Sequence, residues 1–143
     1  MRVRIETDGA SRGNPGEAAG AAVLFDEAGR QVGRVGRYLG TTTNNVAEYT
    51  GLLAGLDLAL ELRATDIEVR ADSELMVRQL NGVYRVKNPG LQVLYGQVVE
   101  RLQRFASYRI VHVPRERNRA ADRAANETVD RRASFVEAGD GGA

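Results

Sequence analysis

The chain has 143 residues, of which 43% are hydrophobic, and a formal net charge of +1. This length and composition predict one domain with a core of its own. The sequence contains no cysteine, which excludes disulfides, thiolate metal sites and cysteine nucleophiles. A single histidine argues against a zinc site and against a Ser-His-Asp triad. A metal would instead be bound by carboxylates and water, a donor set that favours Mg²⁺ or Mn²⁺.

Neither a membrane span nor a signal peptide is indicated by the hydrophobic pattern. No apolar run approaches the ~18 residues that a span needs, and the N-terminus has no signal-peptide pattern. We therefore expect a cytoplasmic protein without a membrane partner. Because the net charge is close to zero, any basic surface for nucleic acid has to be local.

Three strands are predicted in the first part of the chain. Residues 2–7 alternate between apolar and charged side chains, as in a half-buried strand. Residues 18–25 and 31–39 predict two more strands, and the turn signal at 26–29 separates them. Short turns between three successive strands predict an antiparallel meander.

Helices and strands alternate in the rest of the chain. Apolar residues recur at helical spacing in four segments, and short apolar runs indicate two further strands. Strands separated by helices should run parallel within one sheet. The predicted elements are a helix over 44–62 capped by Thr43 or Asn44, a strand over 67–71, a helix capped by Ser73 that runs through Leu80, a helix from Asn88 to Leu102, a strand over 108–113 and a helix capped by Asn118.

The fold class that follows is α/β, with a five-stranded mixed sheet flanked by helices. The domain is expected to span residues 1–132. Beyond Arg132 the composition becomes rich in Ala, Gly and Asp, which predicts a flexible C-terminal tail over 133–143.

Four carboxylates occupy strand ends or helix starts in this arrangement. Asp8 is expected to end the first strand and Asp72 the fourth, while Glu48 and Asp122 fall near the starts of helices. Each has a simpler explanation, since acidic residues complement helix dipoles and an Asp can start a turn. Together, however, they would meet at one edge of the sheet and repel one another without a divalent cation. Two such ions could hold a phosphodiester and activate a water molecule.

Four segments together resemble a known family. TDGASRGNPG, TTNNVAEYTGLLAGL, ADSELMVRQL and RERNRAADRAAN resemble, in order and spacing, the signature segments of type 1 ribonuclease H. The resemblance implies a sheet order of 3-2-1-4-5. It also implies hydrolysis of the RNA strand of RNA/DNA hybrids by an endonuclease that leaves 5′-phosphate and 3′-hydroxyl ends.

The resemblance also implies the roles of individual residues. By motif, Asp8, Glu48, Asp72 and Asp122 would be the catalytic metal ligands for two Mg²⁺ ions, with Mn²⁺ as a possible substitute. The implied substrate contacts are Ser11, Gly13 and Asn14 along the RNA minor groove, Asn44 and Asn45 at the same groove, Thr43 at a phosphate of the DNA strand, and Glu74 beside Asp72. The paired asparagines have a second interpretation as helix caps.

The chain departs from many relatives in two places. Residues 82–89 pass almost directly between two helices, where many relatives insert a basic helix and loop that grips the hybrid. Arg85 and Lys87 form either a small basic patch, with Tyr84 beside it, or only a solvated turn. Without the insert we expect weaker and more salt-sensitive binding of hybrids.

The second departure is the loop before the last helix, residues 113–118. Many relatives have a mobile histidine there, and this loop has none. His112 falls within a predicted strand and is interpreted as structural. Arg115 or Arg117 is expected to aid substrate positioning or product release, although an Arg cannot act as a general base near neutral pH.

Two other functions are alternatives to a hybrid-specific endonuclease. One is a non-catalytic nucleic-acid-binding module on the same fold, which the presence of all four acidic positions disfavours. The other is a carboxylate-metal 3′→5′ exonuclease, disfavoured because the acidic residues stand in the ribonuclease H segments. The expected partner is an RNA/DNA hybrid bound by a monomer. The preferred metal, activity on double-stranded RNA and the existence of a further C-terminal domain are left open.

Overall fold

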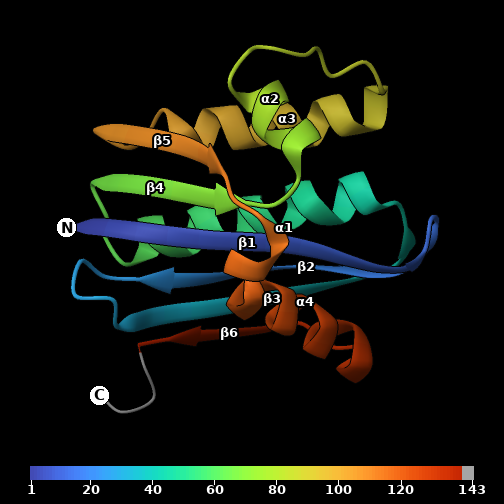
Figure 1. Cartoon of the computed structure of the whole chain (residues 1–143), viewed down its shortest axis with the longest axis horizontal. Coiled ribbons are helices and arrows are strands. Elements are labelled where there is room, and N and C mark those ends of the chain that lie inside the picture. Colours follow the sequence, from blue (N-terminus) through green and yellow to red (C-terminus); the bar gives the residue numbers. More distant parts are fainter. Residues whose placement is uncertain (140–143) are drawn as a thin grey trace.

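A computed structural model describes residues 1–139, which form a six-stranded mixed sheet flanked by helices on both faces (Figure 1). The strand order is β5-β4-β1-β2-β3-β6. The strands β1, β2 and β3 form the antiparallel meander, and β4 and β5 run parallel to β1. The bounds are β1 Arg2–Gly13, β2 Gly16–Phe25, β3 Gln31–Thr42, β4 Asp66–Ala71, β5 Ser107–His112 and β6 Phe135–Ala138.

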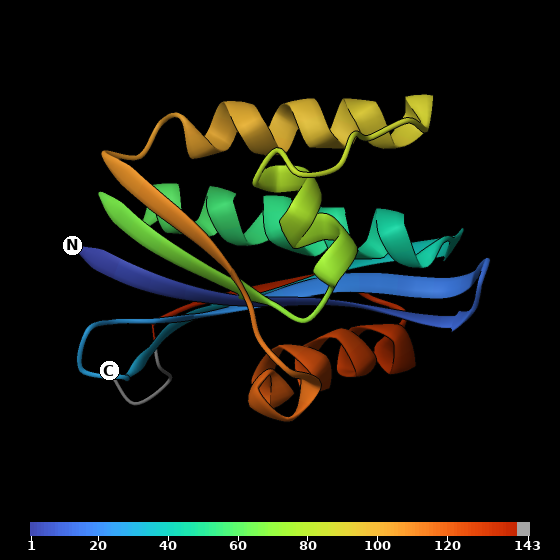
Figure 2. The same cartoon turned by 45° about the horizontal axis from the view of Figure 1, so that its top comes forward.

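The helices lie on opposite faces of the sheet. Figure 2 shows α1, α2 and α3 on one side and α4 on the other. A short 3-10 turn, η1, leads into α4. The bounds are α1 Asn44–Glu61, α2 Glu74–Leu80, α3 Pro89–Leu102, η1 Arg115–Arg117 and α4 Arg119–Arg131. Only residues 81–88 connect α2 to α3, so the direct passage predicted there is confirmed.

The central strand β2 is buried on both faces because α1 and α4 sandwich it. Its residues from Ala18 to Leu24 are almost completely excluded from solvent. Most of them are alanine or glycine, which lets both helices approach the sheet closely. At Gly20, a Cβ atom would lie 2.3 Å from the backbone nitrogen of Gly51 in α1.

A large hydrophobic core fills the space between the sheet and the first three helices, while a thinner layer lies under α4. The thinner layer uses small side chains, including Ala21, Ala124 and Ala125. The largest completely buried side chains of the main core are Tyr49, Ile5, Leu24, Leu52, Leu56, Met76 and Leu102.

Local hydrogen bonds determine where three helices begin. The Thr43 hydroxyl accepts from the Val46 amide, so Thr43 rather than Asn44 caps α1. Ser73 caps α2 as predicted, and the Asn88 side chain caps α3. These bonds satisfy amides that a helix leaves unpaired in its first turn.

The predicted strand order is confirmed, but the sheet has one strand more than expected. Residues 133–143 were predicted as a flexible tail, and this is wrong for Phe135–Ala138, which pair with β3 as β6. The Phe135 ring explains the difference: the guanidinium groups of Arg34 and Arg131 lie 4.6 and 5.7 Å from its centroid. The last part of the predicted tail, 140–143, lies outside the described residues.

Within residues 1–139, no helix has the length and apolar character required to cross a membrane.

Candidate active site

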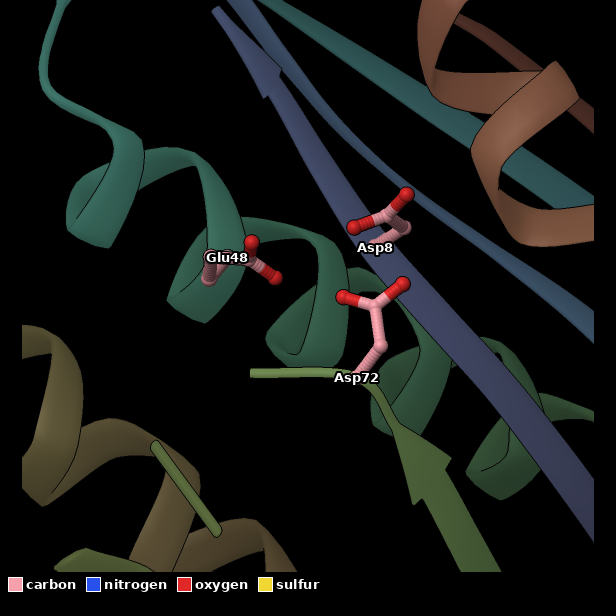
Figure 3. A group of neighbouring side chains, drawn as sticks. All are labelled: Asp8, Glu48 and Asp72. Carbon is pink, nitrogen blue, oxygen red and sulfur yellow. The ribbon is translucent and has the colours of Figure 1, made fainter. Parts of the chain in front are cut away.

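Three of the predicted carboxylates come together at one place on the sheet. Asp8 lies on β1, Glu48 on α1, and Asp72 directly after β4, with their carboxylates turned toward one another (Figure 3). One oxygen from each lies within 4.8 Å of the others. The group therefore offers three oxygen ligands from three separate elements.

The sheet topology brings Asp8 and Asp72 together. Parallel pairing of β1 with β4 ends at the pair Thr7 and Ala71. Asp8 and Asp72 each directly follow one member of this pair in the sequence, so they emerge side by side. Asp8 was expected to end the first strand, and this is wrong: β1 continues to Gly13, paired with β2 alone. Asp8 instead marks the end of the parallel ladder, where ligands commonly bind in α/β sheets.

Close packing of α1 on β1 brings Glu48 to the same place. A Cβ atom on Gly9 would lie 2.5 Å from the Glu48 backbone nitrogen and 2.7 Å from the Ala47 carbonyl carbon. Only glycine permits this approach without a shift of the helix. The residue after Asp8 thus determines how near the third carboxylate can come.

Burial and mutual repulsion alter the protonation of the group. Burial, followed by the charge of Asp72, raises the pKa of Asp8 to about 8. Burial, followed by the charges of Asp8 and Asp72, raises the pKa of Glu48 to about 9. Burial therefore disfavours the ionised form of both groups more than the repulsion between the carboxylates does.

The donor set fits a divalent cation. The Glu48 Oε2 atom is buried and, among the described residues, has no hydrogen-bond partner. An unpaired buried carboxylate oxygen is costly unless it binds a cation. Mg²⁺ and Mn²⁺ prefer hard oxygen ligands of this kind.

Asp122 lies beside the three carboxylates but is not one of the group. It stands in the first turn of α4, as predicted, and its Oδ1 atom accepts from the Asn126 side chain at 3.2 Å. Its proximity adds a smaller rise to the pKa of Asp8. Its assignment as a metal ligand therefore remains a prediction.

Asn118 has a different role from the one predicted. It occupies the capping position of α4, yet its side chain makes no capping hydrogen bond. The Nδ2 atom instead donates to the Thr7 carbonyl at 2.9 Å and to Asp72 Oδ2 at 3.3 Å. The amide of this completely buried residue thus joins the strand β1 to the carboxylate of Asp72.

A pocket of about 630 Å³ contains the carboxylates and several of the predicted substrate residues. Ser11, Asn44 and Asn45 line it. The Asn44 backbone amide also donates to Asn14 Oδ1 at 3.1 Å, which joins the β1–β2 hairpin to the start of α1. The full lining is Asp8, Gly9, Ala10, Ser11, Arg12, Asn44, Asn45, Glu48, Asp72, Ser73, His112, Val113, Pro114, Arg115, Asp122 and Asn126.

The other predicted substrate residues lie outside this lining. Gly13 ends β1 at the hairpin, with a φ of 115°, and Thr43 caps α1. Glu74 is exposed on α2, where it forms an ion pair with Arg78 at 2.8 Å. Their contacts with a substrate remain predictions.

The two arginines of the loop differ in position. Arg115 lines the pocket, and its positive charge favours the ionised form of Glu48, whereas Arg117 is not part of the lining.

His112 was interpreted as structural, but it is exposed at the end of β5 and lines the pocket. His112 falls within the strand predicted over 108–113, and no motif of the sequence marks it as a pocket residue. Arg12 and Asn126, also in the lining, were not predicted.

Comparisons with known proteins agree with this geometry. Residues 6–128 match the family model described as "Reverse transcriptase-like". The chain is 45% identical over 139 residues to a bifunctional protein of Mycobacterium tuberculosis, and spans 38% of that protein's length. It is 43% identical over 129 residues to ribonuclease HI of Halobacterium salinarum, covering 90% of this chain and 65% of that protein.

Solved structures show the same relationship. The crystal structure of RNase H1 from Halobacterium salinarum has a TM-score of 0.88 at 43% identity, and the match covers 92% of this chain and 99% of that one. LC11-RNase H1, a compost metagenome protein crystallised in complex with an RNA/DNA hybrid, has a TM-score of 0.83 at 41% identity, with coverage of 91% and 98%. The chain therefore belongs to the ribonuclease H1 family.

Proposed function

We propose that this protein is a metal-dependent endoribonuclease that hydrolyses the RNA strand of RNA/DNA hybrids and leaves 5′-phosphate and 3′-hydroxyl ends. The observation that carries the proposal is the group of Asp8, which is buried, and Glu48 and Asp72, which are half-buried, in the lining of one pocket. A relative with 41% identity, LC11-RNase H1, was crystallised with such a hybrid. Membership of the same family supports a common substrate.

The four acidic residues are the metal ligands in this proposal. Asp8, Glu48 and Asp72 bind two Mg²⁺ ions, or Mn²⁺ as a substitute, and Asp122 completes the set from α4. Ions held by these residues would supply activation of the attacking water and stabilisation of the leaving 3′ oxygen. Before the metal binds, protons on Asp8 and Glu48 relieve the repulsion within the group, as their raised pKa values indicate.

The surface beside the carboxylates serves to hold the hybrid. Ser11, Gly13 and Asn14 follow the RNA minor groove, where 2′-hydroxyls distinguish RNA from DNA. Support comes from the hydrogen bond between Asn14 and Asn44, which makes the hairpin and the start of α1 one continuous surface. The remaining contacts in the proposal are Asn45 at the groove, Thr43 at the DNA strand and Glu74 beside Asp72.

Arg115 is proposed to position the substrate or assist product release. Its place in the pocket lining supports this role. Its guanidinium group suits a phosphate, to which it can donate two parallel hydrogen bonds. We further propose that the enzyme acts as a monomer in the cytoplasm, where RNA/DNA hybrids would be accessible to it.

The proposal is tested by comparing wild type with Asp8→Asn on RNA/DNA, RNA/RNA and DNA/DNA duplexes, with Mg²⁺ and with Mn²⁺. Only the hybrid should be cut efficiently, and Asp8→Asn should lose that activity. Glu27→Gln, which alters an exposed carboxylate in the β2–β3 turn, is the matched control and should retain it. Hybrid cleavage that survives Asp8→Asn undiminished would refute the site assignment.

A circular duplex with an internal RNA stretch separates an endonuclease from an exonuclease. An endonuclease opens such a substrate, which has no end at which an exonuclease could start. Cleavage of linear hybrids without opening of the circle would favour the 3′→5′ exonuclease. Binding without cleavage of either substrate would favour the non-catalytic module.

A further inference from the structure

The Asn118 side chain joins β1 to Asp72 at the point where β1 and β4 separate. Beyond the pair Thr7 and Ala71, no backbone ladder connects these two strands. There Asn118 Nδ2 donates to the Thr7 carbonyl at 2.9 Å and to Asp72 Oδ2 at 3.3 Å. The amide therefore takes the place of the missing ladder, directly beside the three carboxylates.

Few groups of the protein hold these carboxylates in place. Asp8 Oδ1 accepts from the Gly9 backbone amide at 2.9 Å, and Glu48 Oε2 has no hydrogen-bond partner within the part of the chain that the structure describes. Across residues 1–139, Asn118 is the only residue whose side-chain amide, hydroxyl or cationic group donates to any carboxylate of the three. For Asp72 this contact is made at Oδ2, at 3.3 Å.

The local structure also shows that Asn118 is not used as an ordinary helix cap. A capping hydrogen bond from this position would stabilise α4 by about 1 kcal/mol. The side chain forgoes it, and its Oδ1 atom is buried without a partner among the described residues. A residue that breaks a local rule in this way is often placed for function rather than for stability.

The Asn118 backbone connects the loop that carries Arg115 to the helix that carries Asp122. Its amide donates to the Arg115 carbonyl at 3.0 Å, and its carbonyl accepts from the Asp122 amide at 3.1 Å. One residue therefore connects β1, Asp72, the loop that carries Arg115 and the helix that carries Asp122.

We propose that Asn118 is a positioning residue, which holds the Asp72 carboxylate at the distance from Asp8 and Glu48 that divalent metal binding requires. The inference deepens, and rests on, the proposed function. Loss of a side chain that orients a metal ligand typically lowers metal affinity or activity by 10- to 100-fold.

The test uses Asn118→Leu, which is similar in size but has no donor, and Asn118→Ala, which adds no bulk. Calorimetric titration with Mn²⁺ in the absence of nucleic acid should show affinity lower by roughly tenfold or more in both variants. On RNA/DNA hybrids, kcat should fall while KM stays within about twofold, because the surface that contacts the hybrid is unchanged.

The matched control is Thr128→Val, in the same helix. Thr128 is also completely buried, and its hydroxyl donates to the Ala124 carbonyl at 2.7 Å, away from the carboxylates. This variant should lower the melting temperature without altering Mn²⁺ affinity. A purely structural Asn118 would behave in the same way.

Wild-type Mn²⁺ affinity in the folded Asn118 variants would overturn the inference, and so would failure of both variants to fold, since the residue would then serve the fold itself. A wild-type protein that binds Mn²⁺ but does not cut hybrids would overturn the proposed function alone. In that case Asn118 is still judged by metal affinity. A wild-type protein that binds no Mn²⁺ would overturn both.

Discussion

Gly9 and Glu48 are in such close contact that a single added methyl group would not fit between their backbones. A Cβ atom on Gly9 would lie 2.5 Å from the Glu48 nitrogen. Because the neighbouring residue Asp8 points to the same place as Glu48, this contact sets the spacing of two carboxylates. The site therefore depends on an absent side chain as much as on the acidic ones.

Replacement of Gly9 by alanine should separate Glu48 from Asp8. The added methyl group meets backbone atoms of α1, which cannot rotate away, so we expect destabilisation of about 1–3 kcal/mol. Chemical denaturation measures this loss, and a parallel hybrid cleavage assay should show a larger loss of activity than the fraction unfolded explains.

Gly96→Ala is the matched control for this substitution. Gly96 lies in α3, and a Cβ atom there would meet no atom of residues 1–139 within 4 Å, its chain neighbours and the backbone of its own helix aside. Since alanine is the better helix former, this variant should be more stable by about 0.5–1 kcal/mol and fully active. Equal stability of the two variants would contradict the importance of the Gly9 contact.

The raised pKa values predict how stability of the metal-free protein changes with pH. Folding raises the pKa of Asp8 from an ordinary 3.8 to about 8 and that of Glu48 from 4.5 to about 9. In this window the folded state binds more protons than the unfolded state, so the free energy of unfolding decreases as the pH rises from about 4 to about 9. Above both pKa values of the folded state, the free energy of unfolding has lost the whole contribution of these two groups and does not decrease further through them.

Asp8→Asn removes part of this loss. In EDTA at pH 9 we expect the variant to melt higher than wild type by roughly 3 °C or more, with a much smaller difference at pH 5. Millimolar Mg²⁺ should reduce the difference at pH 9, because the cation stabilises the ionised wild-type group. Glu27→Gln serves as the control. An equal gain at both pH values would show that proton binding at the site is not the cause.

Arg115 and Arg117 should differ in their effects on turnover. Of these two arginines, Arg115 lines the pocket that contains Glu48 and Arg117 does not. Loss of a charged contact of about 1.5–3 kcal/mol corresponds to a fall in turnover of roughly tenfold or more for Arg115→Ala. Arg117→Ala, two residues away in the same 3-10 turn, is the matched control and should retain turnover. Steady-state cleavage of a hybrid measures both, and unchanged turnover in the Arg115 variant would remove it from the proposed mechanism.

The segment between α2 and α3 provides a test of hybrid binding. Tyr84, Arg85 and Lys87 are exposed there, in a connection that contains no inserted helix. If this is a basic patch, Arg85→Ala with Lys87→Ala should weaken hybrid binding. The slope of log K against log salt concentration should also become shallower, by the equivalent of about 1–2 phosphate contacts. Fluorescence anisotropy between 50 and 200 mM salt, in an Asp8→Asn background, measures the slope.

Arg30→Ala controls for loss of positive charge, because Arg30 lies exposed in the β2–β3 turn. It should leave the slope unchanged. An unchanged slope in the double variant would identify the segment predicted at residues 82–89 as a solvated turn, which is the alternative stated in the sequence analysis.

Much of the fold follows from local patterns in the sequence. The alternation in residues 2–7 and the helical spacing in 44–62 indicate which faces are buried. They do so because buried side chains recur with the residue repeat of a strand or of a helix. Ser73 could be predicted as a cap because its hydrogen bond spans three residues. The three clustered carboxylates could be identified because each stands in a recognisable segment.

Contacts between distant segments decided the rest. The strand β1 extends to Gly13 because β2 pairs with it there, and Phe135 forms part of a strand because Arg34 and Arg131 pack on its ring. Asn118 follows the sequence pattern of a helix cap, but its side-chain amide donates instead to the carbonyl of Thr7, which is 111 residues away.

The sequence by itself determined which residues are acidic and, apart from β6 and the far end of β1, which segments become helices or strands, since these depend on composition and short-range hydrogen bonds. Only the tertiary structure decided that Glu48 meets Asp8 across Gly9, that Asp122 stands slightly apart, and that Arg115 rather than Arg117 lines the pocket. These relationships depend on how closely α1 and α4 pack on the sheet, a distance that the local patterns do not encode.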